Sequence, residues 1–376
     1  MDFSFSEEQT LLRNTVQSFL RDKYDFDTRR KISASTEGWS RETWQQFAEL
    51  GLLAVPFSEE QGGLGGGSIE TMIVMEEFGR NLVIEPFLET VVIAGGFLRQ
   101  AGTAAQQEAH IPGIIGGETV WTFAYAEPQG RYNLADLTTT AKADGDGYVI
   151  NGYKCVVLGA PWADKLIVSA RTSGGQRDAD GVSLFIVDKN SAGVSTRDYP
   201  TVDGRRASEV TLENVAVGAD AVIGEIGKAL PLIELVTDQA IAALSAEATG
   251  GMKELNEATV EYCKTRKQFG VPIGSFQVLQ HRMVDMFMAY EQSVSMTYMV
   301  ALKLDEEDGE RRKAASGAKV QIGKAGRYVG QQAVQLHGGM GMTDELNVGH
   351  YFKRLTMIDT QFGNVDHHLA RYSTAA

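Results

Sequence analysis

The stretch RKQFG at residues 266–270 decides the fold assignment of this chain, together with QLHGGMG at residues 335–341. Each stretch closes a long segment with helical periodicity, and Phe276 and Gln277 open the next segment after the first stretch. A basic last turn suits an ordinary helix end, and glycine is common just after a helix. Arginine also pairs with pyrophosphate through planar, charge-assisted hydrogen bonds, and glycine lets a backbone come close to a ligand. Each motif therefore has a structural and a ligand-binding interpretation.

Helical periodicity dominates both ends of the chain. Ser6 and Gln9 have the spacing of a capping box, so we expect a helix to begin there. Long helical segments are expected roughly over residues 230–264, 274–305 and 310–337. Helices of about 30 residues exceed the globular average of about 11–12, which favours a bundle of long helices.

The middle of the chain has a different texture. From residue 119 to about residue 223, short β-branched runs alternate with turn residues such as Asn151-Gly152. No long helical pattern interrupts them, so a parallel doubly wound sheet is not expected. We therefore predict an α+β chain in three parts. These are an N-terminal helical domain over residues 1–118, a middle antiparallel, β-barrel-like domain over 119–225, and a C-terminal four-helix-bundle-like domain of long helices over 226–376.

Composition restricts the partners of this chain. Its 376 residues suit two or three domains with a large core. The 35 basic and 49 acidic side chains leave a net charge of −14. Nucleic acid and anionic membranes are polyanions, so we expect neither as a partner.

Cysteine usage and the N-terminal stretch favour a cytoplasmic protein. Cys155 and Cys263 are the only cysteines, which is too few for a disulfide framework, and no metal-binding motif surrounds them. The N-terminal residues are acidic and lack the pattern of a signal peptide, and no apolar run reaches the length of a membrane span.

The two motifs and the order helical, β, helical resemble the acyl-CoA dehydrogenase family over nearly the whole chain. The resemblance implies an FAD-dependent oxidoreductase that desaturates an acyl-CoA thioester between its α and β carbons. In this family both motifs contact the ADP half of an FAD that is held by a neighbouring subunit. The resemblance assigns cofactor binding to Arg266, Gln268, Phe269, Phe276, Gln277, Gln335, Gly338 and Gly339.

The chain departs from the family at the position of the catalytic base. The family has a glutamate just before a glycine, about two dozen residues after the Gly-Gly pair, where this chain reads Gln361-Phe362-Gly363-Asn364. Phe362 takes the position of the glutamate, and a register slip by one residue would place there a glutamine or a glycine. None of these side chains accepts a proton, so no catalytic residue is assigned.

Positions that face the flavin ring and the substrate also differ from the family pattern. Residues 127–128 match a Thr-Glu-Pro segment, but Ala126 and Tyr132 replace residues that carry hydroxyl groups. Residues 156–158 read Val-Val-Leu where the family has Trp-Ile-Thr or Trp-Ile-Ser, so the aromatic plate over the flavin is missing. Residues 240–241 are Ala and Ile where many relatives have a substrate-contacting arginine or, nearby, the base. The altered positions all lie on the ring side, whereas the ADP side is retained.

This one-sided loss leads to the main hypothesis. The chain resembles the pimeloyl-CoA dehydrogenase small subunit and the non-catalytic subunits of heteromeric acyl-CoA dehydrogenases of steroid side-chain degradation. It would complete the FAD site of a second acyl-CoA dehydrogenase subunit while lacking a base of its own. The resemblance further implies a role in fatty acid or steroid side-chain catabolism, an acyl-CoA substrate, a dimer of dimers and an electron acceptor such as an electron-transfer flavoprotein.

Two alternatives remain open at this stage. The chain could be a self-sufficient homo-oligomeric dehydrogenase with a relocated base, for which Glu234 and Asp238 lie one helical turn from Ile241. It could instead be a flavin-free binding or scaffold protein on the same fold.

Three other features are interpreted as structural. The glycine-rich residues 62–67 follow no strand, so they predict a flexible loop rather than a dinucleotide motif. His367 and His368 are expected to face solvent, because adjacent helical residues point in different directions. Five methionines on one helical stretch are expected in the core: Met283, Met286, Met288, Met296 and Met299.

Overall fold

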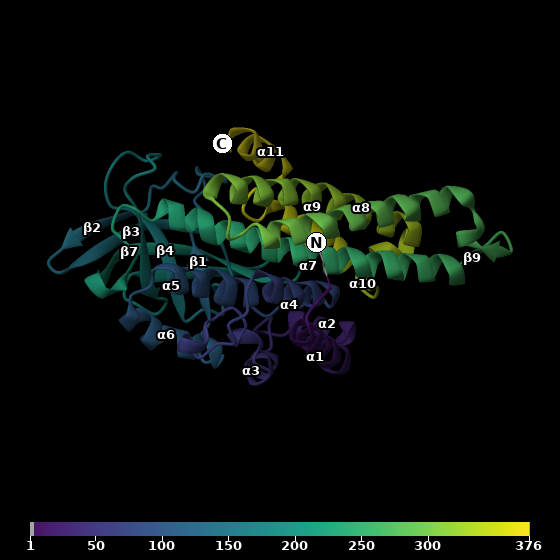
Figure 1. Cartoon of the computed structure of the whole chain (residues 1–376), viewed down its shortest axis with the longest axis horizontal. Helices are drawn as coiled ribbons and strands as arrows, with labels where there is room; N and C mark the ends of the chain where they lie inside the picture. Colours follow the sequence, from purple (N-terminus) through teal and green to yellow (C-terminus); the bar gives the residue numbers. More distant parts are fainter. Residues whose placement is uncertain (1–3, 376) are drawn as a thin grey trace. The chain divides into compact units, whose positions relative to one another are not determined.

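The computed structural model describes residues 4–375, and Figure 1 shows the succession of its elements along the chain. Residues 1–3 and 376, which the prediction assigned to the terminal domains, lie outside this part. The chain forms two compact units. The helical unit comprises the described residues of Met1–Ala34, Ser68–Ile84 and Ile241–Ala376. The sheet unit comprises Ser35–Gly67 and Glu85–Ala240. The predicted three-part division at residues 118 and 225 stays a prediction.

The helical unit begins where the capping box predicts. The Ser6 hydroxyl accepts a hydrogen bond from the Gln9 amide at 3.1 Å, and the Gln9 side chain accepts one from the Ser6 amide at 3.0 Å. Three helices follow from the N-terminal part of the chain: α1 (Glu7–Lys23), α2 (Phe26–Ala34) and α4 (Ser68–Arg80). Val16 and Leu20, one helical turn apart on the same face, are the buried residues of α1.

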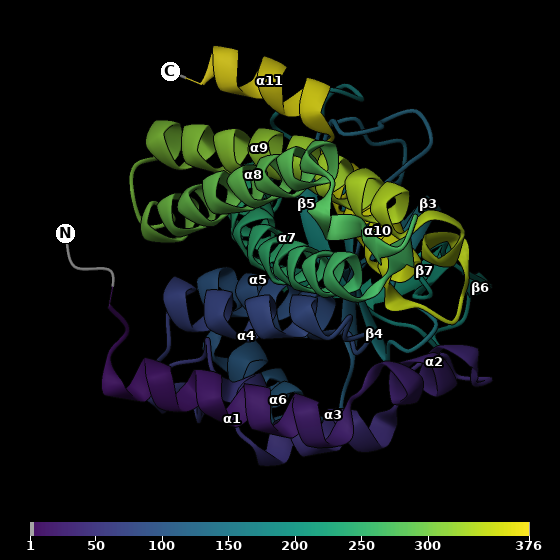
Figure 2. The same ribbon diagram turned by 90° about the vertical axis from the view of Figure 1, so that its right-hand side faces the viewer.

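Long helices build the rest of this unit, as predicted. They are α7 (Leu230–Thr265), which runs in from the sheet unit, α8 (Gln277–Leu302), α9 (Asp308–His337), α10 (Asn347–Thr360) and α11 (Val365–Thr374). Helices α8, α10 and α11 all pack against α9, as Figure 2 shows. In the buried ion pair that joins α10 to α7, Arg354 donates to both carboxylate oxygens of Glu247 at 2.5 and 2.7 Å.

Helices α4 and α7 cross at two glycines. A Cβ atom built on Gly79 would lie 1.9 Å from the carbonyl oxygen of Glu247, and one built on Gly250 would lie 1.9 Å from that of Glu76. These distances are far below van der Waals contact, so any larger residue would force the two helices apart. The glycines are needed here because the backbones touch.

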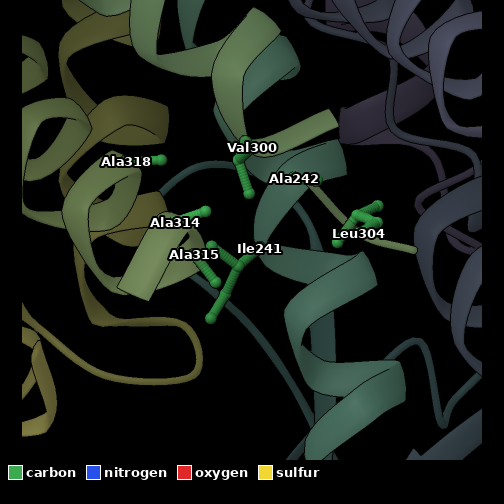
Figure 3. Packing of buried hydrophobic residues seen from close by; sticks show 7 residues of the cluster. All are labelled: Ile241, Ala242, Val300, Leu304, Ala314, Ala315 and Ala318. Carbon is green, nitrogen blue, oxygen red and sulfur yellow. The ribbon is translucent and has the colours of Figure 1, made fainter. Parts of the chain in front are cut away.

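A small-residue core joins α7, α8 and α9. Figure 3 shows its buried members: Ile241, Ala242, Val300, Leu304, Ala314, Ala315 and Ala318. The alanines let the helices approach closely, and Met296, Met299 and Phe362 pack against the cluster from its margin.

The methionine prediction is therefore right for part of the stretch only. Met286 is fully buried, but half of the Met288 side chain is exposed. Met288 lies on a surface of α8 that no described residue of the helical unit covers, and sequence periodicity cannot distinguish such a surface from a core face.

The sheet unit holds the strands. Its helical parts are α3 (Arg41–Glu49), a π-helical segment (Leu88–Ala94), α5 (Gly95–Ala101) and α6 (Ala104–Ile115). The strands are β1 (Trp121–Ala124), β2 (Thr140–Asp144), β3 (Gly147–Leu158), β4 (Lys165–Arg171), β5 (Val182–Asp188), β6 (Val194–Pro200), β7 (Arg206–Gly218) and β8 (Val222–Ile223). They pair in the order β6-β7-β3-β2-β4-β5-β8, with β1 also on β4.

The predicted β-region is confirmed, but its sheet is mixed rather than purely antiparallel. Strand β1 pairs with β4 in parallel, and β2 meets β4 in parallel at Thr140 and Arg171. Parallel pairing requires a long connection between the strands. Residues 125–164, which include the β2–β3 hairpin, provide that connection, and turn signals alone do not reveal it.

The glycine-rich loop is held by its own backbone rather than being a free connector. Gly63 donates to Ser58 at 2.8 Å and Gly65 donates to Phe57 at 2.7 Å. A Cβ atom on Gly63 would lie 2.1 Å from the Phe57 carbonyl oxygen, so the loop passes too close for a side chain. No helix among the described residues combines the length and apolar composition needed to cross a bilayer.

Candidate functional site

The end of α7 opens into a small hairpin rather than a simple helix end. Strands β9 (Lys267–Gln268) and β10 (Val271–Pro272) pair antiparallel, with the turn at Phe269 and Gly270. Both turn residues have positive φ angles, 54° and 81°, as the tightest hairpin turns require. The sequence prediction ended one helical segment at this stretch and began the next at Phe276 and Gln277, with no strands between them. It missed the hairpin because phenylalanine is not a turn signal at a left-handed position.

Phe269 is an unusual residue for this turn. It is 92% exposed, and among the described residues its ring meets only that of Phe276, edge to face at 6.1 Å between centroids. Asparagine or glycine adopts this backbone conformation at lower cost. A strained and exposed aromatic side chain is typical of a surface that another molecule covers.

The glycine turn after α9 is also open. Gly338 has φ 60° and ψ −138°, a conformation that only glycine adopts readily. A Cβ atom built on Gly338, Gly339 or Gly270 would meet no other atom within 4 Å. Crowding inside the chain therefore does not explain these glycines, and a ligand could approach their backbone.

The structure brings the two motifs together at one end of the long helices. The rings of Tyr262 on α7 and His337 on α9 lie 4.3 Å apart between centroids. Phe276 caps α8, Gln277 is its first residue, and Gln335 lies in the last turn of α9. All eight predicted cofactor residues therefore belong to three neighbouring helix ends, and Figure 1 shows β9 at the tip of the α7–α8 pair.

The chemistry of these helix ends fits the ADP half of a flavin nucleotide. Arg266 and Lys267 are exposed, and no ion pair joins either side chain to another described residue. Neighbouring Lys264, by contrast, pairs with Glu261 at 2.5 Å. Two unpaired cations beside glycine backbones suit a pyrophosphate group. The role of the eight residues stays a prediction, since the structure contains no ligand.

A buried lysine holds the turn that carries Phe362, the residue at the position of the family's base. The Lys319 ammonium donates to the carbonyl oxygens of Ile358 at 2.8 Å, Asp359 at 2.9 Å and Gly363 at 2.7 Å. The side chain of Asp359 pairs with Arg327 at 2.7 Å and is 4% exposed as a residue. The nearest carboxylate before the turn is therefore already committed to an arginine.

His368 holds the same turn from α11. Its Nε2 atom lies 3.0 Å from the Phe362 carbonyl oxygen, which only accepts, so Nε2 carries the proton. Burial lowers the pKa of His368 to about 3, and the positive charge of Lys319 acts in the same direction. The prediction that both histidines face solvent is thus wrong for His368, because it lies on the face of α11 that packs against α9.

Phe362 itself is partly buried at the margin of the core. Its ring packs against the Ile241 cluster, and its φ angle of 55° is rare for an aromatic residue. Of the two candidates for a relocated base, Asp238 is fully buried and Glu234 is half-buried, both on the part of α7 that belongs to the sheet unit. No finding assigns catalysis to either of them.

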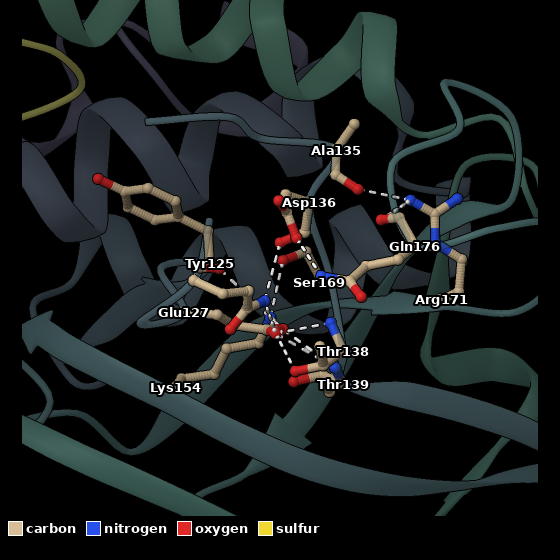
Figure 4. Close-up of polar contacts among 11 residues, drawn as sticks. Tyr125, Glu127, Ala135, Asp136, Thr138, Thr139, Lys154, Ser169, Arg171 and Gln176 are labelled. Atoms are coloured by element: carbon tan, nitrogen blue, oxygen red, sulfur yellow. Dashed lines mark hydrogen bonds and ion pairs between the residues drawn. The ribbon is translucent and has the colours of Figure 1, made fainter. Parts of the chain in front are cut away.

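In the sheet unit, Glu127 is the centre of a buried polar network, drawn in Figure 4. Its carboxylate accepts from Lys154 at 2.7 Å, from the Thr138 amide at 2.7 Å and from the Thr139 amide at 3.1 Å. Burial alone would raise the pKa of Glu127, but the charge of Lys154 and the hydrogen bonds outweigh it and hold the pKa at about 2. The residue that matches the family motif is thus a structural anchor for the segment after β1.

Sequence reasoning missed Lys154, although its signal was present. Residues 150, 152 and 154 share one face of β3, and Ile150 and Lys154 are both fully buried. A lysine on a buried strand face requires a counter-charge, and Glu127 is the carboxylate that the structure supplies. Burial lowers the pKa of Lys154 to about 8 against the attraction of Glu127.

The segment that matches the family's flavin-ring contact has a strained backbone at Val156. Strand β3 is irregular between Lys154 and Val157 where it pairs with β7, and Val156 has φ 50° with 48% of its side chain exposed. A β-branched residue in this region is an outlier. The position is therefore exposed, as an aromatic plate would need, but carries only a small apolar side chain.

Matches to known proteins agree with this geometry. Three family models match the chain in succession: the acyl-CoA dehydrogenase N-terminal domain over residues 6–118, the middle domain over 122–215 and the C-terminal domain over 237–371. The probable acyl-CoA dehydrogenase YngJ of Bacillus subtilis is 30% identical over 353 residues, which cover 93% of this chain and 92% of that protein.

Two solved structures of acyl-CoA dehydrogenases with paired names are similar over their whole length. The Tcur3481–Tcur3483 steroid ACAD variant has a TM-score of 0.88 and 29% identity, with 98% of this chain and 97% of that chain covered. The ChsE4–ChsE5 complex of Mycobacterium tuberculosis has a TM-score of 0.91 and 25% identity, with 99% and 98% covered. From the fold, the paired motifs and these matches, the chain belongs to the acyl-CoA dehydrogenase family, whose members are FAD-dependent oxidoreductases.

Proposed function

We propose that this chain is the base-lacking subunit of a hetero-oligomeric acyl-CoA dehydrogenase, and that it supplies the ADP-binding half of the FAD site of its partner. One contrast carries the proposal. The position of the base holds Phe362, packed on the Ile241 cluster, whereas the hairpin and the glycine turn are exposed and unobstructed. A chain that keeps one half of the site accessible and places a partly buried apolar side chain in the other is suited to complete the site of a neighbouring subunit.

The roles of the retained residues follow from their chemistry. The Arg266 guanidinium and the amide of Gly339 would bind the pyrophosphate. The amide of Gly338 donates to the Gln335 carbonyl oxygen, so this glycine would only let the backbone come close to the ligand. The Phe269 and Phe276 rings would pack on adenine or ribose. Three exposed glutamines would add hydrogen bonds at the rim: Gln268, Gln277 and Gln335. FAD, when bound, supplies the acceptor for the hydride that leaves the acyl-CoA.

An exposed apolar stripe on α8 supports an obligate partner. Val284, Phe287 and Met288, which have the i, i+3, i+4 spacing of one helix face, are 55%, 53% and 50% exposed. Beside them lies a groove of about 520 Å³ between α7 and α8, with Val260 and Met283 in its wall. Apolar patches of this kind mark protein interfaces. We propose that a second acyl-CoA dehydrogenase subunit covers the stripe and that two such pairs form a dimer of dimers.

The remaining assignments rest on the family and on the named relatives. The steroid ACAD variant and the ChsE4–ChsE5 complex are the relatives with two named components, which favours a bulky acyl-CoA, from steroid side-chain or fatty acid catabolism, as substrate. An electron-transfer flavoprotein would accept the electrons. Two unpaired cysteines, Cys155 and Cys263, agree with a cytoplasmic location.

Expression of the chain alone and together with a second acyl-CoA dehydrogenase chain tests the proposal. We expect the chain alone to be colourless, and the pair to be yellow and active. Yellow, active protein from the chain alone would instead support the relocated base, and a chain that stays colourless with every partner would support a scaffold.

Arg266→Ala in the assembled pair tests the trans contribution directly. Loss of the guanidinium removes a charge-assisted contact to pyrophosphate, which costs about 1.5–3 kcal/mol and weakens FAD retention at least tenfold. Lys264→Ala is the matched control, since that lysine is already paired with Glu261. Unchanged flavin occupancy in Arg266→Ala would contradict the proposal.

A further inference from the structure

The contact between Tyr262 and His337 joins the two ends of the proposed nucleotide site. The rings are 4.3 Å apart between centroids and inclined by 31°. Tyr262 lies one helical turn before Arg266, and its carbonyl oxygen accepts the Arg266 amide at 2.8 Å. His337 directly precedes the Gly338 turn. A single ring pair therefore connects the arginine corner with the glycine turn.

The histidine is held in one orientation by its own helix. His337 is 4% exposed, and its Nδ1 atom lies 2.8 Å from the Ala333 carbonyl oxygen. Because that oxygen only accepts, Nδ1 carries the proton. Burial lowers the pKa of His337, so the ring is neutral at physiological pH. The imidazole is thus a fixed surface against which Tyr262 packs.

The hairpin is tied to the end of α7 by a hydrogen bond and a close backbone contact. The Ile273 amide donates to the Arg266 carbonyl oxygen at 2.8 Å, which closes the base of the hairpin. A Cβ atom on Gly274 would lie 2.9 Å from the carbonyl oxygen of Cys263, so the returning strand rests directly on the helix. Any shift of Tyr262 relative to α9 would therefore carry Arg266 with it.

We propose that Tyr262 and His337 are positioning residues, which set the distance between the Arg266 corner and the Gly338–Gly339 turn so that both hold one dinucleotide at once. This inference rests on the proposed function. Two contacts reinforce each other only when their spacing matches the ligand. The half-buried tyrosine and the buried histidine need not touch the ligand to control its affinity.

The first experiment measures FAD affinity in the native complex, captured through a tag on this chain and stripped of flavin before titration. Tyr262→Ala should weaken FAD binding by roughly tenfold, because the two contacts no longer act together. Tyr262→Phe keeps the ring and should bind FAD as the unaltered chain does. Tyr262→Leu fills the space without a ring, and it replaces the alanine variant if that one does not fold. Tyr298→Ala removes a half-buried ring from α8 and controls for a general loss of stability.

The second experiment separates positioning from a purely structural role. A double-mutant cycle of Arg266→Ala and Gln335→Ala measures the coupling between the two segments in FAD binding. The coupling should be present with Tyr262 and absent in Tyr262→Ala. Coupling that persists in Tyr262→Ala would overturn the inference. If Arg266→Ala alone leaves FAD affinity unchanged, the proposed function fails. If Arg266→Ala weakens binding and Tyr262→Ala does not, only the positioning role fails.

Discussion

At the scale of the residue, Phe362 lies in a turn that buried side chains hold in place. The turn that carries it keeps its supports, because Lys319 still donates to three carbonyl oxygens and His368 holds the Phe362 carbonyl. The backbone keeps a left-handed conformation at φ 55°, while the side chain packs on Ile241. The architecture of the turn therefore persists without a group that accepts a proton.

Phe362→Glu should not restore activity. The new carboxylate would face an alanine-rich apolar cluster, where burial raises its pKa, and Val156, Leu158 and Ile241 would stay unchanged. We expect a stability loss of about 2 kcal/mol by urea denaturation, since an aromatic contact is exchanged for a poorly solvated acid. Phe362→Leu, which keeps an apolar side chain, should lose less. Acyl-CoA turnover by the glutamate variant without a partner would contradict this view.

At the scale of the element, the Glu127–Lys154 pair ties the segment after β1 to the middle of β3. Neither side chain is exposed, and Glu127 also holds the amides of Thr138 and Thr139 at the start of β2. Removing one partner leaves a buried charge, so Lys154→Met should cost about 3–5 kcal/mol. The double variant Glu127→Gln/Lys154→Met should cost less, because no unpaired charge remains.

The same pair makes acid stability a measurable property. The folded pKa of Glu127, about 2, lies below the ordinary value of 4.5, so its contribution is fully present above about pH 4.5 and is lost as the pH falls toward 2. In Lys154→Met the pKa of Glu127 should rise, and the loss should begin at a higher pH. Urea denaturation between pH 3 and 7 would show the shift. Identical pH profiles for both proteins would refute the assigned role of the pair.

At the scale of the whole molecule, the proposed assembly depends on the exposed stripe on α8. Phe287→Asp places a charge in the middle of this stripe and should prevent assembly with the partner, because desolvating an unpaired carboxylate is costly. Size-exclusion chromatography of the co-expressed pair would measure the effect. Glu291→Gln, one helical turn further along the same exposed side of α8, is the control and should leave assembly intact. A Phe287→Asp pair that assembles normally would place the interface elsewhere.

Sequence reasoning and tertiary structure contributed different parts of this picture. Periodicities of 3.6 and 2 residues are local, so the long helices, the strand-rich middle and the Ser6 cap could be predicted from the chain itself. The phenylalanine at position 362, where the family has a carboxylate, can also be read directly from the sequence. The parallel β1–β4 pairing, the hairpin turn at Phe269 and the burial of His368 could not be predicted. They depend on which distant surfaces meet.

Residue types alone therefore determined the family resemblance. They also predicted the arginine, the glycines and the phenylalanine at position 362 on which the proposals rest, because each is a matter of chemistry at a position of the family's motifs. Only the tertiary structure decided that the ring of Tyr262 on α7 packs against the ring of His337 on α9. It also decided that Glu127 forms an ion pair with Lys154. Both contacts join segments far apart in the chain. Packing selects such contacts, and no spacing along the sequence encodes them.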